Sequence, residues 1–208
     1  WSSDVCSSDL GTLLETEARG LLARLNQVRP LALNETMVPA AALPPRAALE
    51  IERFLHTGRV LLRQRVQDYL AWLRGPGRNA PPAEQHHRFV LIRMRFNAIL
   101  SQLDMFTEVV TQRSESRTGT WLSGLDVLAD DALRFSPLVQ DPPALVCYLA
   151  RGPGAAIRRA KTKMPGGDLS PAGIIRIPRE RMVGHGIASS LVHEVGHQRS
   201  EEHTSELQ

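Results

Sequence analysis

Two long stretches of the chain carry apolar residues at helical spacing, and they constrain the fold more than any other feature. In residues 47–74 and 84–113 the apolar positions recur every three or four residues, which is the period of an amphipathic α-helix. Gly75, Pro76 and Gly77 follow the first stretch and are expected to end its helix. The pattern therefore predicts two long helices paired as an antiparallel hairpin. We expect a buried stripe on the second helix that consists of Phe89, Ile92, Phe96, Ile99, Leu103, Phe106 and Val110.

Further helices are predicted on both sides of this hairpin. Residues 11–27 have leucines at helical spacing, and residues 31–46, rich in Ala, Leu and Pro, indicate a linker. Another helix is expected over residues 120–135, and a shorter one is expected to begin at Pro142 and Pro143. The residues of 120–135 expected to face the core are Trp121, Leu125, Leu128 and Leu133.

The character of the sequence changes near Lys161. Residues 173–178 are short and β-branched and have prolines around them, so they predict a strand at the edge of a sheet. A helix follows, from about residue 180 or 182 to at least residue 198. The predicted fold class is mainly α with minor β (α+β). Its parts are an N-terminal helix and linker (11–46), a helical body (47–160) and a partial catalytic core (161–198).

The two ends of the chain correspond to one DNA sequence translated from its two opposite strands. Residues 199–208 can be back-translated as AGATCGGAAGAGCACACGTCTGAACTCCAG, and the reverse complement of this string translates as residues 1–10. The string looks like a sequencing-library adapter. We therefore treat residues 1–10 and 199–208 as artefacts and leave them out of the fold prediction.

The charge and composition of residues 11–198 exclude several classes of protein. This part has 188 residues with 24 basic and 17 acidic side chains, a net charge of +7. The arginines are scattered along helices without interleaved aromatic residues, so we expect a solvated surface and no nucleic acid partner. No apolar run approaches the ~20 residues of a membrane span. Cys147 is the single cysteine left, which favours a reducing compartment such as the cytoplasm.

The sequence His193-Glu194-Val195-Gly196-His197 is an H-E-x-x-H motif on the last predicted helix. Residues four apart lie about 40° apart around a helix and ~6 Å apart along it, so His193 and His197 can direct two imidazoles at one metal ion. Glu194 is rotated by about 100° from His193 and reaches a water on that metal. The spacing thus supplies two zinc ligands and one general base. Gly196, which is unfavourable in a helix, predicts close packing of another backbone there.

Residues 174–198 resemble the active-site strand and helix of the zincin metallopeptidases. The resemblance implies zinc bound by His193 and His197, with Glu194 as the general base in peptide-bond hydrolysis by metal-activated water. It also implies a peptide or protein substrate held in extended form along the strand, at Ile174, Ile175, Arg176 and Ile177. The resemblance covers about 25 residues, and we place the helical body in no family.

Zincins take a third zinc ligand from beyond the motif, where this chain has only adapter-like residues. We therefore expect the intact protein to be the enzyme and this chain to be inactive or nearly so. His185 lies ~12 Å from His193 along a continuous helix, too far to share a zinc ion with bonds near 2 Å.

Other candidate residues have a structural interpretation beside a functional one. His86 and His87 are expected to be a solvated pair, because neighbours on a helix face different ways. His56 is expected to be structural or exposed, and Cys147 to be a small core residue instead of a nucleophile. The alternative for the whole chain is a helical interaction protein whose H-E-x-x-H motif is incidental or non-catalytic.

Overall fold

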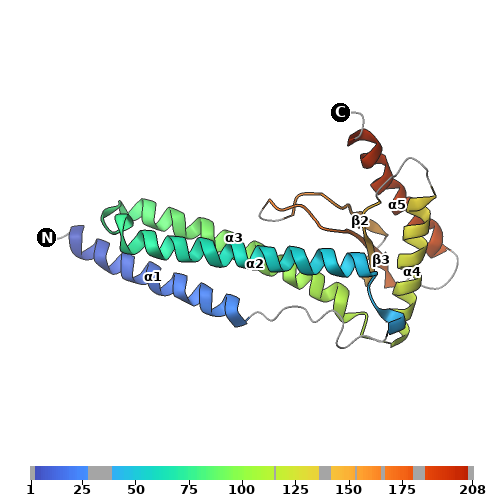
Figure 1. The fold of residues 1–208 in the computed structure, drawn as a ribbon, viewed down its shortest axis with the longest axis horizontal. Helices are drawn as coiled ribbons and strands as arrows, with labels where there is room; N and C mark the ends of the chain where they lie inside the picture. Colours follow the sequence, from blue (N-terminus) through green and yellow to red (C-terminus); the bar gives the residue numbers. More distant parts are fainter. Residues whose placement is uncertain are drawn as a thin grey trace. The chain divides into compact units, whose positions relative to one another are not determined.

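The computed structural model describes residues 3–27, 39–114, 116–135, 142–152, 154–164, 167–179 and 186–205. They form long helices and a small sheet, which confirms the α+β class (Figure 1). The elements are α1 (Ser3–Gln27), η1 (Pro39–Ala41), α2 (Pro45–Arg74), η2 (Pro76–Asn79), α3 (Pro82–Thr111), α4 (Ser116–Arg134), β1 (Leu145–Ala150), β2 (Ala156–Arg158), β3 (Gly173–Pro178) and α5 (Gly186–Ser205).

The chain divides into two compact units, and α2 and α3 each contribute to both. The first unit consists of Trp1–Pro30 and Leu55–Leu103, and the second of Leu31–Phe54 and Asp104–Gln208. None of the helices in the described ranges combines the length and apolar character needed to cross a membrane.

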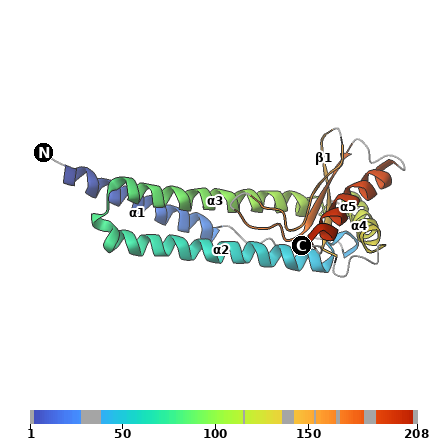
Figure 2. The ribbon, with the colours of Figure 1, turned by 90° about the horizontal axis from the view of Figure 1, so that it is seen from above.

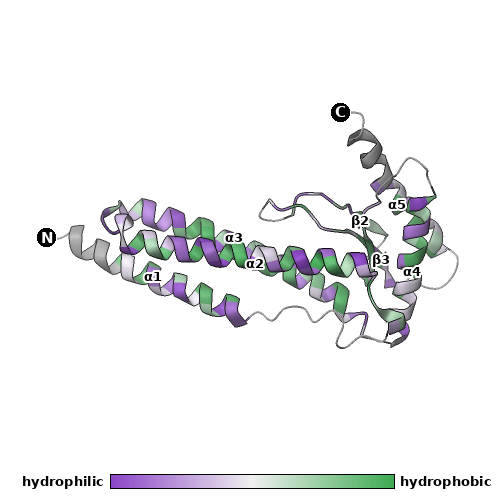
Figure 3. Cartoon of the chain, viewed as in Figure 1, coloured by the Kyte–Doolittle hydropathy of each residue, from purple (hydrophilic) through white to green (hydrophobic). Residues whose placement is uncertain are grey.

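The first unit packs α1 against α2 and α3. Arg74 donates a hydrogen bond to Glu15 (2.7 Å), whereas Arg63 donates one to Asn26 (2.9 Å), and this reversed order makes α1 antiparallel to α2. Green and purple residues alternate along α2 and α3 in Figure 3, as expected of amphipathic helices. The predicted stripe of α3 is buried except for Ile92, which is half-buried.

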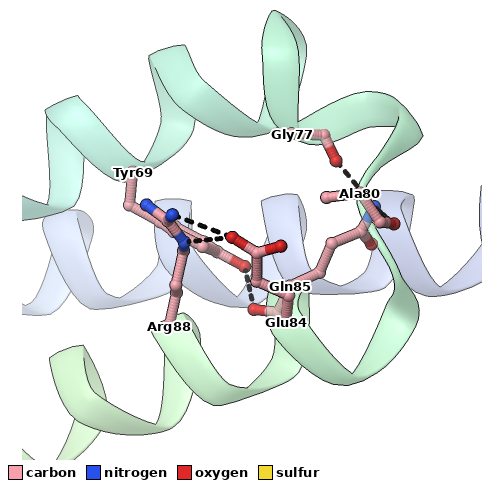
Figure 4. A network of polar contacts seen from close by, with 6 residues as sticks. All are labelled: Tyr69, Gly77, Ala80, Glu84, Gln85 and Arg88. Carbon is pink, nitrogen blue, oxygen red and sulfur yellow. Dashed lines mark hydrogen bonds and ion pairs between the residues drawn. The ribbon is translucent and has the colours of Figure 1, made fainter.

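The turn from α2 to α3 is held by side chains of both helices (Figure 4). α2 ends at Arg74, as the Gly-Pro-Gly sequence predicted. The ring of Trp72 lies over Gly77, where a Cβ atom would come within 2.6 Å of it. The amide of the buried Gln85 donates to the carbonyl oxygens of Gly77 (2.8 Å) and Ala80 (3.3 Å). The hydroxyl of Tyr69 donates to the carbonyl oxygen of Gln85 (3.1 Å), so the hairpin closes without unsatisfied turn carbonyls at these positions.

The second unit contains a three-stranded mixed sheet with the order β1-β3-β2. β3 has the predicted bounds, 173–178, but it is the central strand. It pairs in parallel with β1 along its whole length and antiparallel with β2 at residues 174–176. The prediction of an edge strand is therefore wrong. Pro178 stands at the last position of the strand, where a missing N–H is tolerated.

Two strands lie within the region predicted to be a helical body. Residues 145–150 form β1 instead of a helix, and residues 156–158 form β2. β1 is a short continuous apolar run that is largely buried, and such a run fits a buried helix and a buried parallel strand equally well. Its length of six residues favours the strand.

One face of the sheet forms the core of the second unit with α4 and α5 (Figure 2). Ile175 and Ile177 of β3 contribute to this core, and so do Leu191 and Val195 of α5. The buried side of α4 consists of Leu122, Asp126, Ala129 and Leu133. Of the four residues predicted to face inward, Trp121 and Leu128 are exposed, Leu125 is partly buried and only Leu133 is buried.

Side chains take the place of a further strand along the outer edge of β1. Gln112 donates to the carbonyl oxygen of Leu149 and accepts from its N–H, both at 2.7 Å. Arg113 donates to the carbonyl oxygen of Cys147 (2.6 Å), and the N–H of Cys147 donates to Asp126 (2.7 Å). The N–H and C=O groups of Cys147 and Leu149, which point away from β3, are thus satisfied, and this edge is closed at both positions.

Candidate metal centre

The motif lies on α5, and one face of this helix is fixed by the core. Leu191 and Val195 are buried against the sheet and α4. Gln198, one turn further, is also buried, and its side-chain oxygen accepts a hydrogen bond from the N–H of Ala160 at 2.9 Å. Spacings of four and three residues place these side chains on one stripe. The rotational setting of α5 is therefore determined by packing and by a hydrogen bond.

The opposite face of α5 carries His193 and His197. Both imidazoles are exposed, their ring centroids lie 4.8 Å apart, and the ring planes are inclined by 82°. With zinc–nitrogen bonds of about 2.1 Å, a tetrahedral ion would hold two imidazole centroids about 5 Å apart. The arrangement of the two rings therefore fits two ligand positions of one zinc ion.

Glu194 lies between the buried stripe and the two histidines and is half-buried. Its carboxylate forms no hydrogen bond or ion pair within the part of the chain that the structure describes. The position one residue from His193 is the one required of a base acting beside the metal.

A third ligand is not present among the residues with described side chains. They contain no group of three or more His, Cys, Asp or Glu side chains positioned to hold a metal ion. His185 lies outside the described residues. His86 and His87 are exposed at the start of α3, and His56 is exposed on α2, as expected of histidines without a site.

Cys147 is a core residue. Its side chain is fully buried on β1, and burial raises the pKa of its thiol well above the ordinary value, with the nearby Asp126 adding to the shift. A thiol that stays protonated is a poor nucleophile, so the interpretation as a small core residue is confirmed.

Two expectations about the surroundings of the motif are wrong. A Cβ atom built at Gly196 meets no atom within 4 Å, so no backbone of the described residues packs closely there. Ile174, Ile175 and Arg176 are paired on both edges of β3, and Ile177 is paired with β1 on one edge. An extended peptide therefore cannot add to the backbone of β3 at residues 174–176.

Three buried polar residues that hold β1 were not predicted: Gln112, Arg113 and Asp126. Gln112 and Arg113 lie in the turn between α3 and α4, and Asp126 lies in α4, where hydrophobic periodicity assigns polar residues to the surface. Comparisons of the chain with protein-family models, curated proteins and solved structures find no match.

Proposed function

We propose that α5 carries the metal-binding and general-base residues of a zinc-dependent peptide hydrolase. The observation that carries the proposal is the proximity of the His193 and His197 rings, whose centroids lie 4.8 Å apart, on the exposed face of a helix whose other face is fixed in the core.

The chemistry divides among three side chains of α5. His193 and His197 would hold the ion through one nitrogen each. A zinc ion bound there would supply a Lewis acid that polarises the carbonyl of the scissile bond and acidifies water. Glu194 accepts a proton from the attacking water and delivers it to the leaving amine. A third protein ligand is needed for a stable catalytic site of the usual zinc type.

The edge of the sheet that could take an extended substrate is that of β2. The outer edge of β1 is closed at Cys147 and Leu149 by side chains, and β3 is paired on both sides at residues 174–176. β2, at residues 156–158, is the other terminal strand of the described sheet. We therefore assign the substrate strand to the backbone of β2, in place of the predicted Ile174 to Ile177. Main-chain pairing of this kind gives affinity with little dependence on sequence.

Zinc titration of the intact protein, followed by competition with a chromophoric chelator, tests the metal site. We expect one zinc ion per chain, with binding weakened in H193A and in H197A by more than the ~10–100-fold that loss of an outer-shell partner costs. The double variant H86A/H87A is the matched control, because it removes two exposed histidines that cannot share an ion. Zinc binding that is absent from the wild type, or unchanged in H193A/H197A, would overturn the proposal and favour the helical interaction protein.

The general base is tested separately, in the protein encoded by the uninterrupted gene. E194Q should retain zinc and lose about 10²–10⁴-fold in the hydrolysis of an unfolded polypeptide, the typical contribution of a positioned acid or base. Full activity of E194Q with zinc bound would remove Glu194 from the mechanism.

A further inference from the structure

The face of the sheet that points away from α5 contains a cavity of about 500 Å³. It is lined by residues of all three strands, of α3 and of the segment after β2, among them Met105, Tyr148, Arg158, Thr162, Ile174 and Arg176. This volume is within the range of small-molecule sites. The cavity belongs entirely to the second unit.

Strand alternation separates this cavity from the metal centre. Ile175 and Ile177 point to the core shared with α5, whereas Ile174 and Arg176 line the cavity. Successive side chains of a strand lie on opposite faces. The cavity and the exposed histidines are thus on two different sides of the sheet, so occupation of one does not require occupation of the other.

Two arginines on adjacent strands, Arg158 and Arg176, line the cavity. The pairing partners of Arg176 and Arg158 are Ala156 and Ile174 respectively, so the two arginines are diagonal neighbours on one face, about 7–8 Å apart at the backbone. Neither forms an ion pair or hydrogen bond within the described residues. The Nε atom of Arg176 is buried and has no hydrogen-bond partner there, which is a costly arrangement for a charged donor.

The remaining groups at the cavity fit an anion with an apolar part. Burial, together with the charge of Glu108, raises the pKa of Tyr148, and the charges of Arg176 and Arg158 act in the opposite direction. Glu108 of α3 is exposed and pairs with neither arginine. Met105 and Ile174 supply apolar wall beside the charged groups. Beyond one end of β1, Gly152 lies against the guanidinium of Arg176, since its built Cβ would be 3.9 Å from the Cζ atom.

We infer that this cavity binds a small organic anion whose phosphate or carboxylate group is held by Arg158 and Arg176. The planar guanidinium presents donors in a fork that matches the oxygens of either group. The anion supplies the acceptor that the Nε atom of Arg176 lacks. Its apolar part lies against Met105 and Ile174.

The test is a calorimetric titration of the full chain with phenyl phosphate, benzoate and benzyl alcohol. These probes share an aromatic ring and differ in the charged group. Saturable binding of phenyl phosphate or benzoate, with none of benzyl alcohol, supports the inference, and the tighter of the two anions identifies the group. No saturable binding of either anion up to about 10 mM, or equal binding of the neutral alcohol, overturns it.

Variants of the arginines locate the binding. R158A, at an exposed position, should weaken anion binding about tenfold, as expected for the loss of a charge-assisted hydrogen bond. R176K keeps the charge but loses the fork and should also weaken binding. The control is R117A, which removes an exposed arginine of α4, the helix that packs on the other face of the sheet. Equal affinity in R158A, R176K and R117A would contradict the site.

Discussion

Removal of the carboxylate of Asp126 should destabilise the second unit more than any surface substitution. Asp126 forms an ion pair with Arg113 at 2.8 Å, and the exposed fractions of the two side chains are 1% and 0%. The same carboxylate accepts the N–H of Cys147 on the outer edge of β1. Asp126→Ala therefore leaves a buried guanidinium without its counter-charge and a strand N–H without its acceptor.

The magnitude follows from these two losses. Breaking one partner of a buried ion pair costs about 3–5 kcal/mol of the free energy of unfolding. A buried N–H without an acceptor costs about 1–3 kcal/mol on its own. The two costs are not additive, because the same carboxylate serves the guanidinium of Arg113 and the N–H of Cys147. We therefore expect a total of about 3–5 kcal/mol. That is a large share of the ~5–15 kcal/mol by which domains are usually stable.

Urea denaturation followed by circular dichroism measures this loss, and hydrogen exchange of peptides that contain β1 reports it locally. The control is Asp130→Ala on the same helix, which breaks an ion pair with Arg134 of similar length, 2.7 Å, but 43% and 56% exposed. We expect less than about 1 kcal/mol for this pair. Asp126→Asn separates the charge from the hydrogen bond, since the amide oxygen can still accept from Cys147. If Asp126→Ala costs no more than Asp130→Ala, the reasoning from burial is refuted.

Two further predictions concern glycines and alkaline pH. A Cβ at Gly119 would lie 2.5 Å from the carbonyl oxygen of Arg113, whereas one at Gly124, on the same helix, meets nothing described within 4 Å; thermal denaturation should show Gly119→Ala losing about 1–3 kcal/mol and Gly124→Ala gaining up to about 1 kcal/mol. Gly196→Ala should give a similar gain in stability without altering zinc affinity. A loss of stability in this variant would instead support the close backbone packing that was predicted from the sequence. Burial raises the pKa of Tyr69 from 10.0 to about 12, so its stabilising effect is complete below pH 10 and is lost as the pH rises through 12. In a pH series of denaturation curves Tyr69→Phe should show a smaller decline over this interval, and parallel curves for both proteins would contradict it.

Local signals in the sequence were sufficient for the long helices and for β3. The apolar period of residues 47–74 and 84–113 and the Gly-Pro-Gly sequence between them act within a few turns of the chain. The H-E-x-x-H motif is local as well, because the three residues proposed for the site share about one turn of α5. Their spacing is visible in the sequence.

Nonlocal features were not predictable in the same way. The inward face of α4 contains a polar residue, Asp126, whose partner Arg113 lies before the helix begins. The apolar period alone therefore predicted that Trp121 and Leu128 face the core, but both are exposed. The order of the strands depends on which edges are satisfied by side chains from α4 and from the turn before it, and no pattern within β3 indicates this.

The closed edge of β1 also bears on association between copies of the chain. Leu145–Ala150 reads LVCYLA, with no charge, proline or glycine, and segments of this composition readily form intermolecular β-structure when their edge is open. Gln112, Arg113 and Asp126 occupy the hydrogen-bonding groups of Cys147 and Leu149 that a second copy would need. The residues that complete the sheet thus also protect the chain against aggregation. If these side chains left the edge of β1, a molecule could self-assemble through this strand as well as unfold.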